Sequence, residues 1–261
     1  FTEFFHVMTP YVQALSTTTS KRLTPAWKKG LQGIIDAYLG ETPETFVYQG
    51  KSYTPASFAA SLGLDWNDYV SITSYTHHPF YSAFSLEIQD NWRQGMSWNV
   101  PMDDITRIID YALENGYTVA WGGDVSDDGF TRDGLAILAD IKKIQDDDNS
   151  DMAHWLKLTS TEKKDKLHQL GVSIPELTPS QEKRQEEYDN WELTDDHGMH
   201  IYGKAADQNG REYYMVKNSW GKTGKYNGIW YMSKNYIVAK LMDFMINKNA
   251  IPKDIRKKLG F

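Results

Sequence analysis

Two short stretches decide the fold of this sequence: Asp195–His200, which reads DDHGMH, and Val216–Gly221, which reads VKNSWG. The first opens a run with strand character from Gly198 to Ala205, and the second closes a similar run from Glu212 to Lys217. The turn between them contains Asn209-Gly210, and Asn-Gly is a strong hairpin signal. The pattern therefore predicts that the two stretches lie side by side in an antiparallel hairpin.

This hairpin would bring together side chains that suit nucleophilic hydrolysis. The base of a nucleophilic hydrolase needs a partner at its far ring nitrogen to hold one tautomer, and an Asn carbonyl oxygen can be that partner. We expect His197 to be the base and Asn218 to orient it. Trp220 would cover their hydrogen bond, lower the local dielectric and so strengthen the bond.

A second candidate region is the end of a buried strand, Tyr117–Trp121, which runs into Gly122, Gly123 and Asp124. Two glycines let a peptide backbone approach closely, because no Cβ stands in the way. We expect Trp121, Gly122, Gly123 and Asp124 to border the substrate pocket on the same side as His197. Asp124 is either structural or a partner for the ammonium group of a substrate.

Working outward, the N-terminal part reads as helical and the rest as mixed. Capping residues and apolar spacing predict helices at about 25–39, from Thr54 to Gly63 and from Met102 to Gly116, and strands at 69–75 and 228–233. The charged stretch at about 140–190 predicts two surface helices, and Lys248–Lys258 a solvated one. We expect a helical segment over 1–66 and a β-barrel-type catalytic half-domain over 67–261, with the charged stretch as an insert.

Composition excludes several classes of function. Lys and Arg total 28 against 35 for Asp and Glu, a net charge of −7, so the sequence gives no electrostatic basis for nucleic-acid binding. No apolar run approaches the roughly 18 residues that a membrane span needs. Cys is absent, which removes disulfides, thiolate metal ligands and any cysteine nucleophile within these 261 residues.

The two motifs, in this chain order, closely resemble the His and Asn signatures of papain-like cysteine peptidases. The likeness widens to the bleomycin hydrolase and aminopeptidase C branch at four further places: Pro43–Phe46, Val70–Pro79, the helix that begins at Met102, and Val119–Val125. The resemblance implies an α+β papain-like fold, of which this chain supplies the antiparallel barrel-type half plus helical additions. It also implies a peptide substrate, no metal or organic cofactor, and a homo-oligomer. It favours a cytoplasmic location and leaves export open.

Members of this family carry the nucleophilic Cys, with an oxyanion-hole Gln just before it, on a helix far upstream of the His. We therefore expect this chain to be the C-terminal portion of a longer protein, whose missing N-terminal part supplies the Cys. The branch also extends a C-terminal arm into its own cleft to meet the amino group of the substrate. The ending at Lys257–Phe261 is short for such an arm.

Two other classes of protein stay open at this point. A Cys-free pseudo-peptidase or binding protein would keep His197 and Asn218 without covalent catalysis. A Zn or Mn hydrolase could draw on five side chains: His77, His78, Asp196, His197 and His200. Against the metal reading, His197 and His200 are three apart on a strand, which directs their rings to opposite faces. His77 and His78 are better explained as a loop beside the cleft or as an interface contact.

Overall fold

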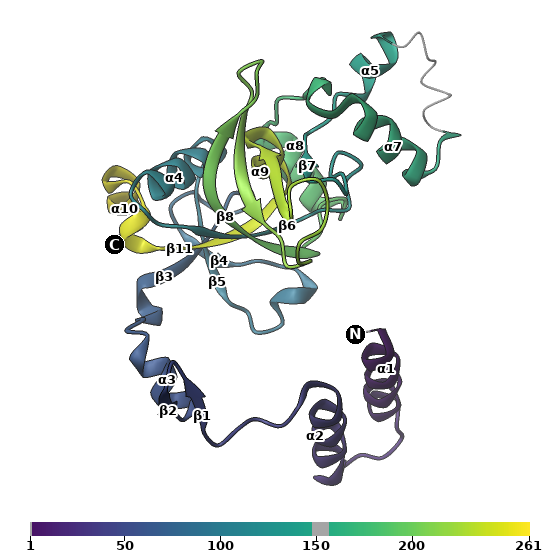
Figure 1. The fold of residues 1–261 in the computed structure, drawn as a ribbon, viewed down its shortest axis with the longest axis vertical. Helices are drawn as coiled ribbons and strands as arrows, with labels where there is room; N and C mark the ends of the chain where they lie inside the picture. Colours follow the sequence, from purple (N-terminus) through teal and green to yellow (C-terminus); the bar gives the residue numbers. More distant parts are fainter. Residues whose placement is uncertain (1, 148–156) are drawn as a thin grey trace. The chain divides into compact units, whose positions relative to one another are not determined.

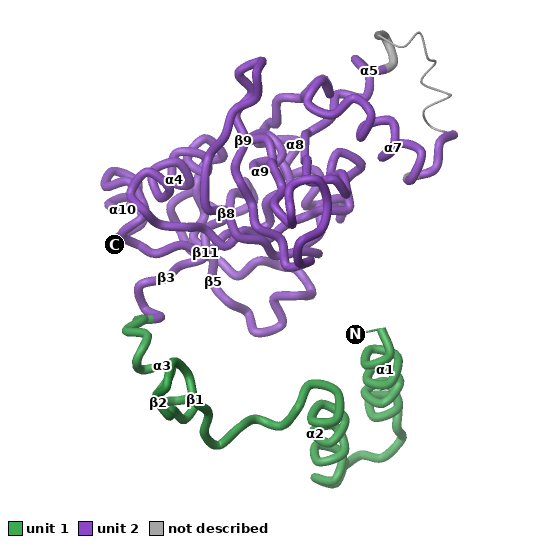
Figure 2. The backbone as a smooth tube through the Cα atoms, in the orientation of Figure 1, with its two compact units in different colours: residues 1–65 green, residues 66–261 purple. Residues whose placement is uncertain are grey.

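Trp66 begins the larger of two units into which the chain divides, residues 1–65 and residues 66–261 (Figure 2). The structure, a computed structural model, describes residues 2–147 and 157–261. Within these residues, no helix is long and apolar enough to cross a membrane. The assignment of a catalytic half-domain to residues 67–261 stays a prediction.

The first unit consists of short elements without a buried side chain among its described residues. The capping box of its last helix explains where that helix begins: the Ser57 amide donates to Thr54 Oγ1 at 3.1 Å, and the Thr54 amide donates to Ser57 Oγ at 2.9 Å. A two-stranded hairpin, which the sequence analysis did not predict, precedes it. The elements are α1 (Thr2–Ser16), α2 (Ala26–Leu39), β1 (Phe46–Tyr48), β2 (Lys51–Tyr53) and α3 (Pro55–Ser61).

The second unit is built on a nine-stranded sheet with the order β4-β5-β3-β11-β6-β8-β9-β10-β7 (Figure 1). Pairing is antiparallel except at β3 with β5 and at β10 with β7. The strands are β3 (Tyr69–Thr73), β4 (Ala83–Ser85), β5 (Met96–Asn99), β6 (Val119–Gly123), β7 (Leu135–Ala136), β8 (His197–Ala206), β9 (Glu212–Lys217), β10 (Ile229–Ser233) and β11 (Leu241–Asn247). Among the described residues the sheet is open, with β4 and β7 at its edges, and does not close into the barrel that was expected.

Helices cover this sheet and complete an α+β fold. The α-helices are α4 (Met102–Glu114), α5 (Ile141–Asp147), α7 (Ser160–Leu170), α8 (Gln181–Asp189), α9 (Lys234–Lys240) and α10 (Lys253–Leu259). Single 3-10 turns lie at Trp66–Asp68, Gln89–Asn91, Gly171–Ser173 and Lys248–Ala250. The main core joins α4 to the strands, because Ile105, Ile108, Ile109 and Ala112 recur at helical spacing and are fully buried.

The prediction of two surface helices in the charged insert holds only in part for α8, which buries Arg184 and Gln185 while its other residues are exposed or half-buried. Arg184 on α8 is 2% exposed, and its guanidinium donates to three backbone carbonyls, those of Ser74 at 3.1 Å, Val238 at 2.7 Å and Ala239 at 3.3 Å. The sequence QEKRQEEYD reads as solvated because six of its nine residues carry charges. A buried Arg is tolerated here since backbone oxygens replace the water that it loses.

The solvated helix expected over Lys248–Lys258 is also only partly present. The structure has a 3-10 turn followed by α10, whose Ile255 and Leu259 are buried in the core. After α10, Phe261 packs edge-on against Trp98 of β5, with ring centroids 4.9 Å apart. Two apolar residues at helical spacing therefore outweigh the surrounding lysines in placing this helix.

Candidate active site

The predicted hairpin places His197 at the first residue of β8 and Asn218 directly after β9. Strand pairing sets His200 opposite Lys217, so the start of β8 lies beside the chain that follows β9. His197 Nε2 and Asn218 Oδ1 are 2.8 Å apart, which is a good hydrogen-bond distance. The geometric part of the prediction is confirmed; the catalytic role of these two residues stays a prediction.

The surroundings of Asn218 determine which nitrogen of His197 carries the proton. The Ser219 amide donates to Asn218 Oδ1 at 2.7 Å, so this atom is the carbonyl oxygen and can only accept. His197 must therefore donate through Nε2–H, which leaves Nδ1 as the ring nitrogen that can accept a proton from a nucleophile. Asn218 is held in place because it is 5% exposed and its backbone N–H donates to the Gly228 carbonyl at 3.1 Å.

Trp220 lies against the imidazole of His197, with ring centroids 5.1 Å apart and planes 40° apart. Its other neighbours are Trp230, at 5.4 Å, and Phe130, at 6.2 Å, and both of these rings belong to the core. Trp220 is 47% exposed, so it shields one side of the imidazole from water and leaves its own outer face in solvent. This position agrees with the covering role expected for it.

Strand β6 lies next to β8 and brings the predicted glycines to the site. Gly123 pairs with His197 and Gly122 with Gly198. The reason for Gly123 differs from the expected one, because a Cβ there would lie 2.1 Å from the Lys240 carbonyl oxygen. This glycine is therefore required by the close approach of the chain's own backbone, independently of any substrate.

Of the four residues expected to border the pocket, Trp121 and Gly122 line a cavity of about 510 Å³ that also contains Asn218, whereas Gly123 and Asp124 are not part of its lining. The side chains of Trp121 and Asp124 are only 1% and 2% exposed. The Trp121 indole donates weakly to the Ile237 carbonyl, at 3.4 Å, and packs in the core. The Asp124 carboxylate accepts from the Ser126 amide at 2.7 Å. Of the two roles open for Asp124, these contacts favour the structural one.

Two other carboxylates flank Gly122 instead. A Cβ on Gly122 would lie 3.1 Å from Asp243 Oδ1 and 3.4 Å from Asp195 Oδ1. Asp243 on β11 lines two adjoining cavities of about 460 and 510 Å³; the first also contains Asp195, and the second also contains Asn218. Asp243 was not among the predicted site residues, although an acidic residue inside the apolar run LMDFMIN is a usable signal.

The electrostatics of these carboxylates are unfavourable in the chain as it stands. Burial, and then the negative charges of Asp243, Asp90 and Asp196, raise the pKa of Asp195 to about 6. Burial also raises the pKa of Asp243, partly offset by a hydrogen bond from Ser71 Oγ. A cationic group in the cavity would relieve both effects.

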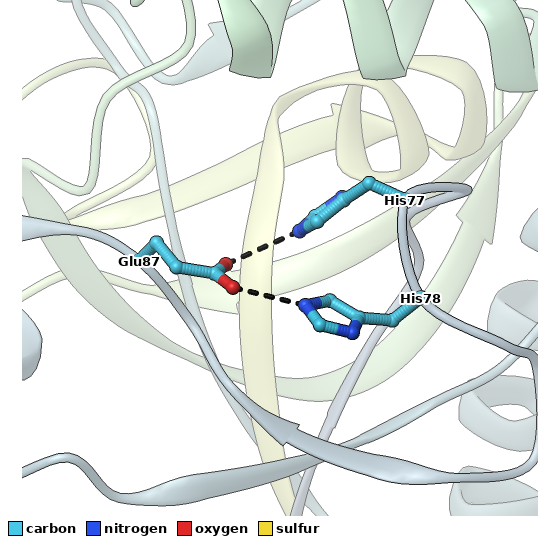
Figure 3. A group of neighbouring side chains, drawn as sticks. All are labelled: His77, His78 and Glu87. Atoms are coloured by element: carbon cyan, nitrogen blue, oxygen red, sulfur yellow. Dashed lines mark hydrogen bonds and ion pairs between the residues drawn. The ribbon is translucent and has the colours of Figure 1, made fainter.

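The histidines of the metal alternative fall into separate places. His77 and His78 lie in the loop after β3, and both face the carboxylate of Glu87 (Figure 3). Among the described residues, this is the group of three metal-ligand side chains that lie within reach of one another, and His197 and His200 are outside it. The arrangement does not support a metal hydrolase centred on His197.

A mainly antiparallel sheet packed with helices, together with a His–Asn pair oriented on the β8–β9 hairpin, is the arrangement of the papain-like class of α+β peptidase fold. The chain belongs to the peptidase C1-like family, whose model matches residues 39–174 and 166–260.

Individual relatives agree with this membership. The chain is 25% identical over 213 residues to aminopeptidase C of Lactobacillus helveticus. The aligned region covers 79% of this chain and 41% of the relative. It is 25% identical over 235 residues to aminopeptidase C of Lactobacillus delbrueckii subsp. lactis, covering 84% and 46%. The chain thus spans less than half the length of these relatives.

A solved structure supports the fold over nearly the whole chain. The crystal structure of PepW from Lactobacillus rhamnosis matches with a TM-score of 0.62 and 20% identity, covering 97% of this chain and 55% of PepW. At this level of identity the match supports the fold alone.

Proposed function

We propose that the protein containing this chain is a papain-like cysteine aminopeptidase, for which this chain supplies the base and its orienting residue. The observation that carries the proposal is the 2.8 Å hydrogen bond between His197 Nε2 and Asn218 Oδ1. It leaves Nδ1 of His197 available to a nucleophile. Since this chain contains no Cys, the nucleophile would come from a part of the protein outside these residues.

The proposed reaction needs no metal or organic cofactor. His197 takes the proton of the Cys thiol, and the resulting thiolate–imidazolium pair makes the sulfur nucleophilic near neutral pH. The thiolate attacks the peptide carbonyl, and the tetrahedral intermediate expels the amine, which receives its proton from His197. Water then hydrolyses the thioester with His197 as base, while backbone and Gln donors of the outside part stabilise the oxyanion. We propose a homo-oligomeric assembly as well, on the basis of the resemblance.

Turnover of the intact protein on a free-amine peptide amide tests this proposal. We expect His197→Ala to lower kcat/KM by about 10³-fold or more, because the base is lost. We expect Asn218→Ala to lower it by about 10- to 100-fold, since orienting a base contributes less than being one. His168→Ala, which removes a half-exposed histidine paired with Asp133, is the matched control.

Inhibitors separate the competing classes of protein. Iodoacetamide should abolish turnover, and a chelator should leave it intact. Turnover that survives iodoacetamide and is lost on chelation would contradict the proposal in favour of a metal hydrolase. No turnover in the intact wild-type protein, with no cysteine near His197, would support a pseudo-peptidase.

A further inference from the structure

A second histidine cluster lies in the larger unit, in residues that the proposed reaction does not use. His77 and His78 are neighbours in the loop that follows β3, and Glu87 follows β4 (Figure 3). His77 Nε2 lies 3.1 Å from Glu87 Oε2, and His78 Nε2 lies 2.9 Å from Glu87 Oε1. We propose that His77, His78 and Glu87 form a binding site for a divalent transition-metal ion, with Zn²⁺ as the expected occupant.

The donor set and its spacing fit this ion. Two imidazole nitrogens and one carboxylate are ligands that Zn²⁺ commonly takes, at about 2.0–2.2 Å each, with a water in the fourth position. Ligand atoms around a tetrahedral ion of this size are about 3.3 Å apart. The three side chains offer atoms that all lie within 4.8 Å of one another, and the two histidine–glutamate contacts need to open by only a few tenths of an ångström.

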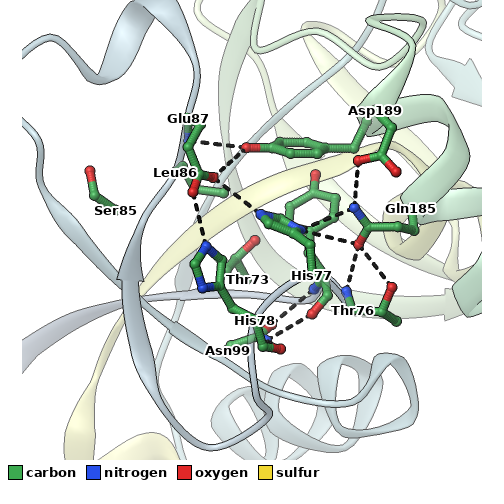
Figure 4. A network of polar contacts seen from close by, with 12 residues as sticks. Thr73, Thr76, His77, His78, Ser85, Leu86, Glu87, Asn99, Gln185 and Asp189 are labelled. Carbon is green, nitrogen blue, oxygen red and sulfur yellow. Dashed lines mark hydrogen bonds and ion pairs between the residues drawn. The ribbon is translucent and has the colours of Figure 1, made fainter.

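The far nitrogen of His77 has a suitable partner for this role. Metal binding through Nε2 requires the proton on Nδ1, and that proton needs an acceptor. His77 Nδ1 lies 3.3 Å from Gln185 Oε1 and 3.0 Å from Gln185 Nε2 (Figure 4). The amide can therefore accept from Nδ1–H in the metal-bound tautomer or donate to Nδ1 in the other.

The rest of the cluster is held in position by neighbouring rings and by α8. Tyr188 of α8 donates its hydroxyl to Glu87 Oε2 at 3.0 Å and stacks on His77, with planes 19° apart. His78 stacks on Phe84, with ring centroids 4.2 Å apart. These contacts leave Glu87 Oε1 facing His78, so a monodentate carboxylate and two imidazoles converge without large rearrangement.

The site is reachable from solvent, which metal loading requires. The side chains of His77, His78 and Glu87 are 29%, 35% and 55% exposed. The rival explanation is a metal-free cluster, in which each histidine donates Nε2–H to Glu87. Because both states use the same atoms, only direct metal binding separates them.

Isothermal titration calorimetry of Zn²⁺ binding to the intact, chelator-treated protein tests the proposal. Every protein compared carries His197→Ala as a background, and 'wild type' below means this background with His77, His78 and Glu87 intact, so that the proposed catalytic imidazole is removed from the set of binders. We expect His78→Ala to weaken the affinity of this site at least about tenfold, and Glu87→Gln to do so while keeping a hydrogen-bonding side chain of the same shape. His168→Ala is the matched control, since it removes a histidine that pairs with the carboxylate of Asp133, at 3.1 Å, and lies outside the cluster of His77, His78 and Glu87.

A second readout protects against variants that fail to fold. Co²⁺ should give the visible absorption of a tetrahedral ion in the wild type and the His168→Ala variant, and lose it in the Glu87→Gln variant. Zn²⁺ should raise the Tm of the wild type and leave that of a folded His78→Ala variant unchanged. Equal Zn²⁺ affinity in the wild type, His78→Ala and Glu87→Gln, or no binding to the wild type, would overturn the proposal. Both readouts are independent of peptidase turnover.

Discussion

Glu87, which is exposed, and Asp195, which is half-buried, are carboxylates of the same unit whose pKa values are shifted in opposite directions. Burial would raise the pKa of Glu87, but hydrogen bonds from His78, His77 and Tyr188 outweigh this effect and lower it to about 2. Among the described residues, hydrogen bonds do not contribute to the pKa shift of Asp195; burial and neighbouring aspartates raise its pKa to about 6. The two carboxylates therefore differ in two respects: Glu87 is the more exposed and accepts several hydrogen bonds, while Asp195 is the more buried and faces other carboxylates.

The cluster of His77, His78 and Glu87, here called the closed site, supplies its own hydrogen-bond donors. The cavities lined by Asp195 and Asp243, here called the open site, leave their carboxylates without a balancing positive charge among the described residues. Around Glu87, side chains from the loop after β3 and from α8 close on the carboxylate. Beside His197, Asp195 and Asp243 line cavities in which their charges repel each other. A cationic part of a substrate fits the second site on electrostatic grounds, and the free ammonium group of a peptide is such a part.

The largest expected effect is on stability, through Arg184, which anchors α8 and so holds Tyr188 and Gln185 at the closed site. Arg184→Ala would remove the donor of the Val238 carbonyl, would leave the Ser74 carbonyl with only the longer contact from Gln181 Nε2 at 3.4 Å, and would open a cavity. We expect a loss of about 3–5 kcal/mol in the free energy of unfolding. Lys183→Ala, at the exposed neighbouring position, should change it by less than about 0.5 kcal/mol. Denaturant unfolding of both variants measures this, and equal small losses would show that α8 is not anchored as described.

The next effect concerns the open site. If Asp195 and Asp243 bind the substrate's ammonium group, the double variant Asp195→Asn with Asp243→Asn should lower kcat/KM for free-amine peptides by about 100-fold, or ~3 kcal/mol. N-blocked peptides should change by no more than about threefold, because they carry no charge to lose. Steady-state kinetics on the matched pair of substrates measures the difference. Equal losses on both would remove these residues from ammonium binding.

The smallest effect is a pair of stability changes with opposite signs. Because the pKa of Asp195 rises from 3.8 unfolded to about 6 folded, its penalty is absent at low pH and grows as the pH rises from about 4 to about 6. Asp195→Asn should therefore stabilise the protein above pH 6, by about 1–2 kcal/mol after screening.

Glu87 should behave in the reverse sense. Its pKa falls from 4.5 to about 2, so its contribution is present above about pH 4.5 and is lost as the pH falls toward 2. Glu87→Gln should destabilise the protein at pH 7 by about 0.5–1 kcal/mol, a figure reduced for the exposure of this side chain. Denaturant unfolding at pH values from 3 to 8 measures the stability of both variants. Stability changes of the same sign at pH 7 would contradict the opposite effects expected for Asp195 and Glu87.

Local sequence signals predicted the parts of this fold that local physics determines. The capping pattern at Thr54 and the apolar spacing around Ile108 gave helices at the observed places, and Asn209-Gly210 gave the hairpin that carries His197. Strand β11 was missed because its neighbours β3 and β6 are far away in sequence, and no turn signal connects them.

The same limit applies to the sites. His197 and Asn218 were identifiable because their motifs belong to one hairpin. Asp243 reaches Gly122 only through the pairing of β11 with β6, and Glu87 meets its α8 partner, Tyr188, across 101 residues. Side chains brought together by such long-range pairings leave no spacing pattern in the sequence, so the open acidic cavity and the closed cluster both required the structure.

The hairpin formed by β8 and β9 has a consequence for the order of folding. His197 and Asn218 are separated by 21 residues, while Arg184 and Ser74 are separated by 110. A hairpin of this kind closes a short loop and can form in about 1–10 μs, whereas contacts between distant segments must wait for larger losses of chain entropy. We therefore expect the His–Asn pair to assemble early and α8 to dock late, so that changes in the length of the charged insert would slow folding without displacing the pair.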